Sequence, residues 1–181
     1  MIYVFLANGF EEVEAITPID MLRRAGKKVI TCAVGDELTI LGAHAVPFVC
    51  DMLAKDCVND GLEGVILPGG MPGTVNLMND VMVRRMVTFC YESDLVIGAI
   101  CAAPSILGRM GILEEKKAVC YPGFEDKLTG AQVLDVPAVT DGKIITARGA
   151  GAALEFSYEL ITAFCGRDKA DEIARAVIWN R

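Results

Sequence analysis

The chain has 181 residues, of which 53% are hydrophobic, and its 17 basic and 24 acidic residues give a net charge of −7. This length fits a single domain, and the apolar content excludes an intrinsically disordered chain. The acidic balance argues against partners such as nucleic acid or an anionic membrane, because both require clustered Lys and Arg. No apolar run reaches the roughly 18 residues that a membrane-spanning helix needs.

Apolar strand-length segments alternate with helical segments along the whole chain. The predicted strands are residues 1–6, 28–34, 64–67, 95–100, 133–139 and 143–147, and residues 37–50 are a predicted hairpin with Gly42 at its turn. The predicted helices are residues 11–25, 75–92, 102–110, 152–164 and 168–179. Such alternation predicts an α/β domain with a parallel sheet covered on both faces. Functional loops are expected after the strands, at residues 7–14, 68–74, 101–104 and 148–151.

The first basic residue is Arg23, and the start of the chain does not fit a signal peptide, so we expect a cytoplasmic protein. The seven cysteines include no CxxC pair, and a disulfide framework is not expected in that compartment. His44 is the only histidine, which leaves no common Cys/His zinc pattern. The default interpretation of each cysteine is a small buried apolar residue.

Cys101 stands between a predicted strand and a predicted helix, and Ala99 and Ala103 flank it two residues away. A tight strand–nucleophile–helix elbow needs small residues at these positions. The first amides of the following helix would favour a thiolate and lower the pKa of the thiol. The residues alone leave this elbow and a buried structural cysteine equally open.

Residues 68–73 (PGGMPG) form a glycine-rich loop between a strand and a helix. Its backbone amides could bind an anion, and they would form an oxyanion hole if Cys101 is a nucleophile. The loop lacks both the GxGxxG order and a GK[ST] ending, so it does not indicate a nucleotide site. An ordinary turn is the alternative.

Glu14 shares a helical stripe with Pro18, Met21 and Ala25. A carboxyl on an apolar stripe is desolvated, which raises its pKa and suits it to proton transfer. The alternative is a partly exposed carboxylate, and this is the favoured interpretation when Glu14 is considered by itself. Its neighbours Glu11 and Glu12 are interpreted as solvated acids of the first helical turn.

Two further residues are candidates for the rim of a site. Arg148 follows a predicted strand in a glycine-containing loop, where a solvated arginine is the favoured alternative. His44 lies in the predicted hairpin, far in sequence from Cys101. A Cys–His pair would require a fold-back of that hairpin and is the less favoured interpretation.

These segments together resemble the ThiJ/PfpI superfamily of the class I glutamine amidotransferase-like fold, in the branch of the Parkinson-disease protein deglycase and its bacterial relatives. The matching runs, in family order, are GFEEVEA (9–15), PID (18–20), RRAG (23–26), LPGG (67–70), AICAAP (99–104) and ARGAG (147–151). The resemblance implies one domain over residues 1–181. Its expected fold is a flavodoxin-like three-layer sandwich with a mostly parallel sheet, helices on both faces and a nucleophile elbow.

The resemblance also implies residue roles. Cys101 would be the nucleophile, Glu14 its carboxyl partner, and the amides near Gly69, Gly70 and Ala102 the oxyanion hole. It also implies a homodimer. The chemistry predicted below needs neither a metal nor another cofactor.

Two positions depart from relatives that use histidine. Tyr121 stands where this family often has a histidine, and Ala102 stands where the peptidase-like branch has one directly after the nucleophile. Tyr121, Arg148 and His44 are candidates for the substrate rim. The departures favour Cys/Glu chemistry and argue against a peptidase.

The predicted function is an enzyme acting on α-oxoaldehydes, such as methylglyoxal and glyoxal, or on their early adducts with protein side chains. The products would be lactate or glycolate, as in a deglycase or glyoxalase. The alternative is a sensor of oxidative stress or a stress-response chaperone that uses oxidation of Cys101, with little turnover. A role in thiazole biosynthesis has no support in the residues.

Overall fold

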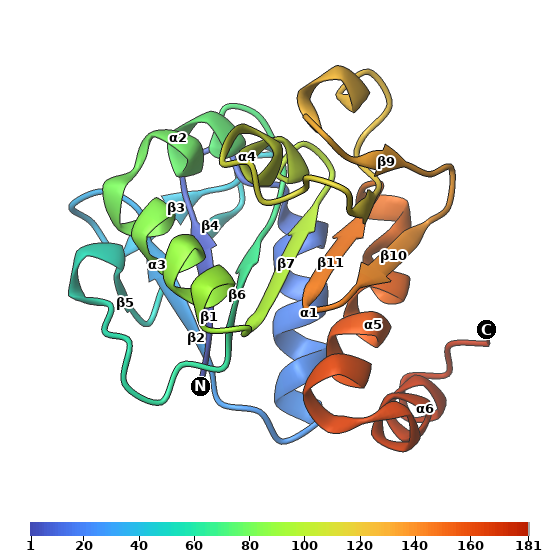
Figure 1. The fold of residues 1–181 in the computed structure, drawn as a ribbon. Coiled ribbons are helices and arrows are strands. Elements are labelled where there is room, and N and C mark those ends of the chain that lie inside the picture. Colours follow the sequence, from blue (N-terminus) through green and yellow to red (C-terminus); the bar gives the residue numbers. More distant parts are fainter. Residues whose placement is uncertain (181) are drawn as a thin grey trace.

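A seven-stranded sheet forms the centre of the computed structural model, which describes residues 1–180. The strands follow the order β10-β11-β7-β6-β1-β2-β5, and every neighbouring pair is parallel except β10 and β11 (Figure 1). The strands of this sheet are β1 (Ile2–Leu6), β2 (Val29–Ala33), β5 (Met52–Leu53), β6 (Gly64–Leu67), β7 (Val96–Ile100), β10 (Ala138–Asp141) and β11 (Ile144–Ala147).

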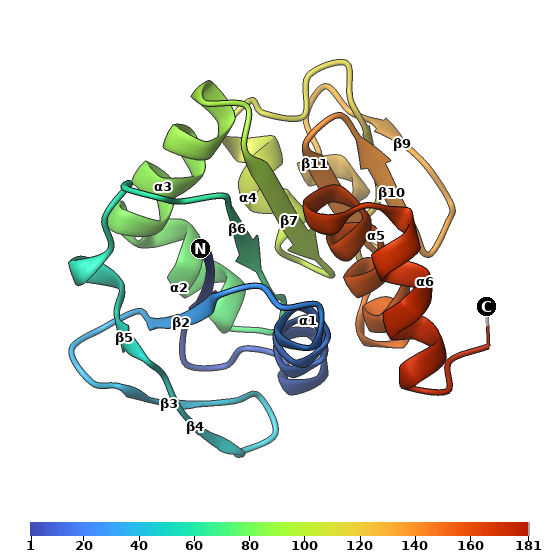
Figure 2. The same ribbon diagram turned by 90° about the horizontal axis from the view of Figure 1, so that it is seen from below.

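Helices cover both faces of this sheet, as predicted for a three-layer sandwich. The α-helices are α1 (Glu12–Arg24), α2 (Gly73–Asn79), α3 (Val81–Glu92), α4 (Pro104–Arg109), α5 (Ala153–Cys165) and α6 (Arg167–Ala176). Helices α1 and α5 pack together on one face with α6 outside them, and α2, α3 and α4 lie on the other face (Figure 2). None of the helices within residues 1–180 is long and apolar enough to cross a membrane.

The central strand β1 shows why the predicted strands read as continuous apolar runs. Tyr3 and Phe5 point into the core beneath α2 and α3, whereas Ile2, Val4 and Leu6 point into the core beneath α1 and α5. Alternate residues of a strand face opposite sides of a sheet, so a strand covered on both sides needs apolar residues at every position.

The predicted hairpin is present and lies beside the start of α1. Its strands β3 (Thr39–Leu41) and β4 (Pro47–Val49) pair antiparallel. The amide of Gly9 donates to the carbonyl of Leu41 at 2.8 Å, and the amide of Ala43 donates to the carbonyl of Phe10 at 2.8 Å. These bonds hold the hairpin against the loop that follows β1.

One predicted helix and one predicted strand are wrong. The helix expected at 75–92 is two helices, because Asp80 takes an extended conformation (φ −73°, ψ 130°) and its carboxylate accepts a hydrogen bond from the amide of Val83 at 2.9 Å. The strand expected at 133–139 is also divided. Its first part belongs to β9 (Gln132–Val133), which pairs with β8 (Lys117–Ala118) in a separate small sheet, and β10 begins only after Pro137. Proline lacks the amide hydrogen that a strand ladder needs.

Other differences are at element ends and in short segments. Helix α4 begins at Pro104 rather than residue 102, and α6 ends at Ala176 rather than residue 179. The strands β5 and β8 were not predicted, because two residues are too few to show a periodic pattern. The structure also contains short 3₁₀ helices at Ala54–Asp56, Glu125–Lys127 and Ala150–Ala152.

Candidate active site

Cys101 occupies a sharp turn directly after β7. Its backbone has φ 64°, a left-handed conformation that is uncommon for a residue with a side chain. Two hydrogen bonds hold it there: its amide donates to the carbonyl of Ala147 at 2.9 Å, and its carbonyl accepts from the amide of Tyr121 at 2.8 Å. The small residues Ala102 and Ala103 that follow are buried. This is the geometry of the predicted elbow.

The loops after β1, β6, β7 and β11 meet at one edge of the sheet, where parallel strands all present their carboxyl ends (Figure 1). They bring Glu14 of α1, the 68–73 loop, Cys101 and the 148–151 loop together. A Cβ atom on Gly69 would lie 2.6 Å from both Cys101 Cβ and Glu14 Oε2. Only glycine fits between the two side chains, a constraint that the GG pair in the sequence did not reveal.

Glu14 is almost fully buried, with 1% of its surface exposed. Its Oε2 accepts a hydrogen bond from the amide of Gly69 at 2.9 Å, and its carboxyl also interacts with the Cys101 thiol. Burial raises the pKa of Glu14 to about 7, although the thiol and the Gly69 amide act in the opposite direction. The apolar-stripe interpretation is therefore the better description of Glu14, and this carboxyl can take up and release a proton near neutral pH.

The pKa of the Cys101 thiol is raised, whereas the sequence predicts that it is lowered. Burial, and then the negative charge of Glu14, raise its pKa to about 12, whereas the amides of Gly70 and Ala102 lower it. The expected lowering assumed a helix starting at residue 102, but α4 begins two residues later and is only six residues long. A proton on Glu14 removes the opposing charge, so the thiolate is favoured when Glu14 is protonated.

The three backbone amides predicted for an oxyanion hole have different partners. The amide of Gly69 donates to Glu14, whereas those of Gly70 and Ala102 interact with the sulfur of Cys101. Gly70 has φ 88°, and a Cβ there would lie 2.4 Å from the amide nitrogen of Glu11. The loop can reach the sulfur only with glycine at this position.

Of the predicted rim residues, Tyr121 lies next to Cys101 and Glu14. Its ring is 3.4 Å from the point where a Cβ on Gly149 would lie, and Glu14 Oε1 is 3.7 Å from the same point. The guanidinium of Arg148 instead forms an ion pair with Asp135. It lines a surface cavity of about 280 Å³ whose lining does not include Cys101.

His44 contacts two acidic residues at the start of α1, Glu12 in its first turn and Glu11 at its N-cap. Its Nδ1 lies 2.9 Å from Glu12 Oε2 and 3.6 Å from Glu11 Oε2, and within residues 1–180 no hydrogen bond joins it to Cys101. Glu12 is only 8% exposed, so its interpretation as a solvated acid is wrong. The sequence did not signal this contact, because His44 and Glu12 are 32 positions apart.

All seven cysteines are free, and they differ in exposure. Cys101 and Cys165 are partly exposed, and the buried ones are Cys32, Cys50, Cys57, Cys90 and Cys120. The default interpretation therefore fits five of the seven. Cys165 ends helix α5 and lacks the elbow of Cys101.

The model of the DJ-1/PfpI family matches residues 1–163. Protein DJ-1 homolog B of Arabidopsis thaliana is 36% identical over 177 residues, which are 97% of this chain but only 40% of that protein, so the chain spans less than half of this relative. The glutathione-independent glyoxalase DJR-1.2 of Caenorhabditis elegans is 32% identical over 91% of this chain and 88% of its own length.

A solved structure shares the fold over almost the whole chain. The oxidized DJ-1 of Toxoplasma gondii superposes with a TM-score of 0.95 at 30% identity, covering 99% of this chain and 98% of that one. The fold, the elbow and the sequence match over residues 1–163 agree. The chain belongs to the DJ-1/PfpI family.

Proposed function

We propose that the protein is a cysteine-dependent enzyme that converts α-oxoaldehydes, or their early adducts on protein side chains, to hydroxy acids. The observation that carries this proposal is the buried Glu14 beside the elbow residue Cys101, with a pKa of about 7. A carboxyl of this pKa can move protons in both directions at neutral pH. The C. elegans relative named a glyoxalase supports the substrate class.

The reaction on methylglyoxal needs only water as a second reactant. The Cys101 thiolate attacks the aldehyde carbon, and the carbonyl oxygen takes the proton from Glu14, giving a hemithioacetal. The Glu14 carboxylate then removes the hydrogen of that carbon as a proton, and the hydroxyl proton of the hemithioacetal passes to the ketone oxygen, which gives an enediol. Glu14 returns its proton to the former ketone carbon, and this leaves a thioester of lactate. Water cleaves this thioester, releasing lactate and restoring the thiol. Glyoxal would give glycolate by the same steps.

The amides of Gly70 and Ala102 are assigned to the developing negative charge. Both interact with the sulfur of Cys101, so an oxygen on a carbon bonded to that sulfur would be close to them. Fixed amide donors stabilise an oxyanion without reorganisation during the reaction. The amide of Gly69 is assigned instead to orienting Glu14, to which it donates.

The test is consumption of methylglyoxal with measurement of the lactate formed. We expect many lactates per chain for the unaltered protein, and loss of turnover in Cys101→Ser. Glu14→Gln keeps a hydrogen-bond donor but cannot exchange a proton, so it should also lose turnover. Cys165→Ser, at the other partly exposed cysteine, is the matched control and should remain active. Full turnover in Cys101→Ser would refute the proposal.

A redox sensor is the second candidate, favoured by the oxidized state of the T. gondii relative. Peroxide would transfer oxygen to the Cys101 sulfur and leave as water, and a second equivalent would give a sulfinate. The protonated Glu14 and the amides of Gly70 and Ala102 would then hydrogen bond to its oxygens. One oxidation event per chain, with no catalytic release of lactate, would support the sensor over the enzyme.

We also propose a homodimer built on α1 and the adjoining hairpin. Exposed apolar side chains gather on these two elements: Val13, Ile16, Leu41, Val46 and Val49. Neighbouring exposed apolar residues of this kind mark protein–protein contact surfaces. A surface shared by two identical chains pairs with itself about a twofold axis.

The dimer is tested by measuring the mass in solution by light scattering. Val49→Asp places a charge in the proposed contact and should give monomers. Val81→Asp changes a similarly exposed valine on α3, on the opposite face of the sheet, and should leave the mass unchanged. A dimer that resists Val49→Asp would contradict this surface.

A further inference from the structure

Three metal-ligating side chains converge where the hairpin crosses the start of α1. His44 Nδ1 lies 2.9 Å from Glu12 Oε2 and 3.6 Å from Glu11 Oε2, and one ligand atom from each residue lies within 4.8 Å of the others. Two atoms bonded to one tetrahedral Zn²⁺ at about 2.1 Å stand about 3.4 Å apart. The distances from His44 bracket this value, so one ion fits among the three with small side-chain movements.

We propose that Glu11, Glu12 and His44 bind a divalent transition-metal ion of the Zn²⁺ type. This departs from the expectation of no metal, which rested on zinc patterns made of nearby cysteines and histidines. The ligands here come from two elements about 32 positions apart, so no local spacing indicates them.

The fold fixes the Glu12 carboxylate in a ligating position. Its Oε1 accepts a hydrogen bond from the backbone amide of His44 at 2.8 Å, which leaves Oε2 facing the imidazole. The hairpin backbone closes around this carboxylate, because a Cβ on Gly42 would lie 2.2 Å from Oε1. Hydrogen bonds to the second oxygen are a common way to orient a metal-binding carboxylate.

The other two ligands are also anchored through the backbone. The amide of Glu11 donates to the carbonyl of Gly69 at 2.9 Å, and His44 lies in the turn between β3 and β4. In the single chain the imidazole is 71% exposed. The site therefore consists of the fixed Glu12 carboxylate, the Glu11 side chain on an anchored backbone, and the His44 imidazole.

The donor set and the charge suit a transition metal. One imidazole nitrogen with carboxylate oxygens is typical of zinc and related ions, whereas Ca²⁺ and Mg²⁺ prefer oxygen ligands alone. Within residues 1–180, neither Glu11 nor Glu12 forms an ion pair with Lys or Arg. An imidazolium would balance one of these two negative charges, and a divalent ion would balance both. Three protein ligands leave a coordination position for water.

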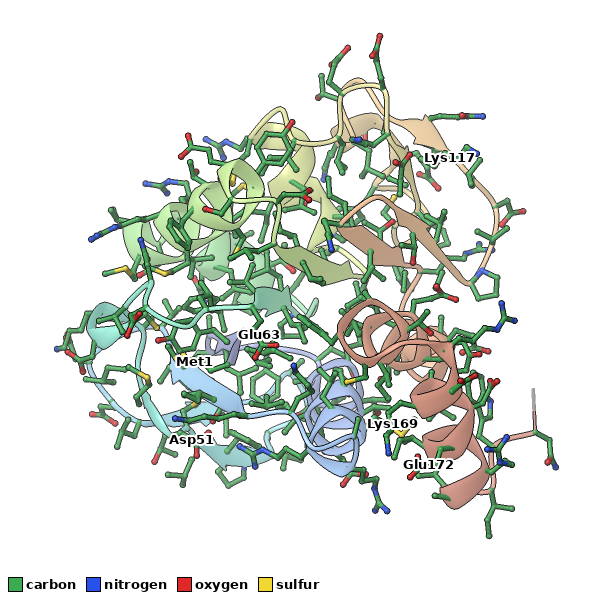
Figure 3. The ribbon with its side chains drawn as sticks, turned by 60° about the horizontal axis from the view of Figure 1, so that its bottom comes forward. Met1, Asp51, Glu63, Lys117, Lys169 and Glu172 are labelled. Carbon is green, nitrogen blue, oxygen red and sulfur yellow. The ribbon has the colours of Figure 1, made fainter. Side chains whose placement is uncertain are left out.

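The test is a calorimetric titration of tag-free Cys101→Ser protein with ZnCl₂, because this background removes the reactive thiol as a competing ligand. We expect one ion per chain, and binding at least tenfold weaker in His44→Gln and in Glu12→Gln. Glu172→Gln, on the distant helix α6 (Figure 3), is the matched control and should bind as tightly as the background. All proteins are compared at one concentration, because the hairpin also carries the proposed dimer surface.

The single histidine gives a second readout that separates a ligand from a structural role. The imidazole resonances in a proton–nitrogen NMR spectrum can come only from His44. They should shift with one equivalent of Zn²⁺ while the rest of the spectrum keeps its folded dispersion. Absence of stoichiometric binding, unaltered affinity in His44→Gln, or imidazole signals that do not respond to bound Zn²⁺ would each overturn the proposal. None of these outcomes depends on aldehyde turnover.

Discussion

A single backbone torsion sets the direction of the Cys101 side chain. At φ 64° the Cys101 side chain no longer follows the alternating directions of the β7 side chains. Its sulfur instead interacts with Glu14 and with the amide of Gly70. A left-handed conformation at a residue other than glycine costs on the order of 1–3 kcal/mol and persists only where its surroundings fix it. The bonds to Ala147 and Tyr121 supply that constraint on both sides of the residue.

Alkylation should find Cys101 first. Of the seven thiols, those of Cys101 and Cys165 are partly exposed and the others are buried. Cys101 stands at the elbow, where the amides of Gly70 and Ala102 interact with its sulfur and lower its pKa against the effect of burial. Limited treatment with iodoacetamide followed by peptide mass spectrometry should label Cys101 before Cys165. Faster labelling of Cys50, Cys57 or Cys120 would show that the elbow does not activate its thiol.

The pKa of Glu14 should also appear in the stability of the fold. Its folded pKa of about 7 lies above the unfolded value of 4.5, so the folded state retains the proton over this interval. Stability therefore falls as the pH rises through that window, by up to about 3 kcal/mol for a group shifted this far. Glu14→Gln removes this loss, so its stability relative to the unaltered protein should increase from about pH 4.5 to about pH 7.5.

The measurement is the free energy of unfolding in urea at the two pH values. Glu37→Gln, in the exposed segment before β3, is the control and should follow the unaltered protein. An equal pH dependence in Glu14→Gln and Glu37→Gln would mean that Glu14 ionises in the folded state as it does in the unfolded chain.

Among the elements, the 68–73 loop determines how closely β6 approaches the elbow. Gly69 separates Cys101 from Glu14, and Gly70 turns with φ 88° so that its amide can reach the sulfur. The loop thus acts as a spacer for the catalytic candidates as well as a source of amides.

Gly69→Ala should therefore abolish turnover while leaving the fold in place. Its new methyl group would lie 2.6 Å from both Cys101 Cβ and Glu14 Oε2, so the two side chains must separate. Gly151→Ala adds the same group where no atom lies within 4 Å, and should remain active. Methylglyoxal consumption and circular dichroism of both variants give the comparison. Normal turnover in Gly69→Ala would show that the close spacing is not needed.

The elements also show which parts of the structure a sequence can predict. Strands β1, β6 and β7 were found because burial on both faces demands apolar residues throughout. The break at Asp80 was missed because apolar periodicity continues across it, and only the capping bond to Val83 reveals the new helix. Two-residue strands such as β5 carry no pattern at all.

In the candidate site, too, the sequence predicts features with a local pattern and not those that depend on distant contacts. Cys101 stood out because its flanking alanines are a local requirement of the elbow. The different partners of the Gly69 and Gly70 amides, and the hydrogen bonds between Glu12 and His44, depend on contacts between distant segments. Those contacts follow from the order of strands in the sheet, which local patterns do not specify.

At the scale of the whole molecule, the parallel sheet gathers chemistry from segments far apart in the chain. Glu14 follows β1, the glycine loop follows β6, and Cys101 follows β7, and these strands are adjacent in the sheet (Figure 1). The same architecture keeps His44 with the hairpin and α1. Cys101 therefore lies beside the carboxyl of Glu14, whereas the one imidazole of the chain, that of His44, bonds to Glu12.

This separation predicts that the protein is not a peptidase. Amide hydrolysis requires an acid to protonate the leaving amine, and cysteine peptidases use histidine for this step. Here Ala102 follows Cys101, the amide of Tyr121 donates to the carbonyl of Cys101, and His44 hydrogen bonds to Glu12. An aldehyde needs no amine to leave, so Cys101 and a carboxyl of pKa about 7 meet its requirements.

The purified protein should therefore release no peptide from casein or fluorogenic substrates in a manner that depends on Cys101. His44→Ala should leave methylglyoxal turnover largely intact, because the imidazole takes no part in the proposed steps. The two assays are run on the same preparations of the unaltered protein, Cys101→Ser and His44→Ala. Peptide cleavage that both substitutions abolish would identify a Cys–His hydrolase instead, and would require the hairpin to move His44 from Glu12 to the elbow.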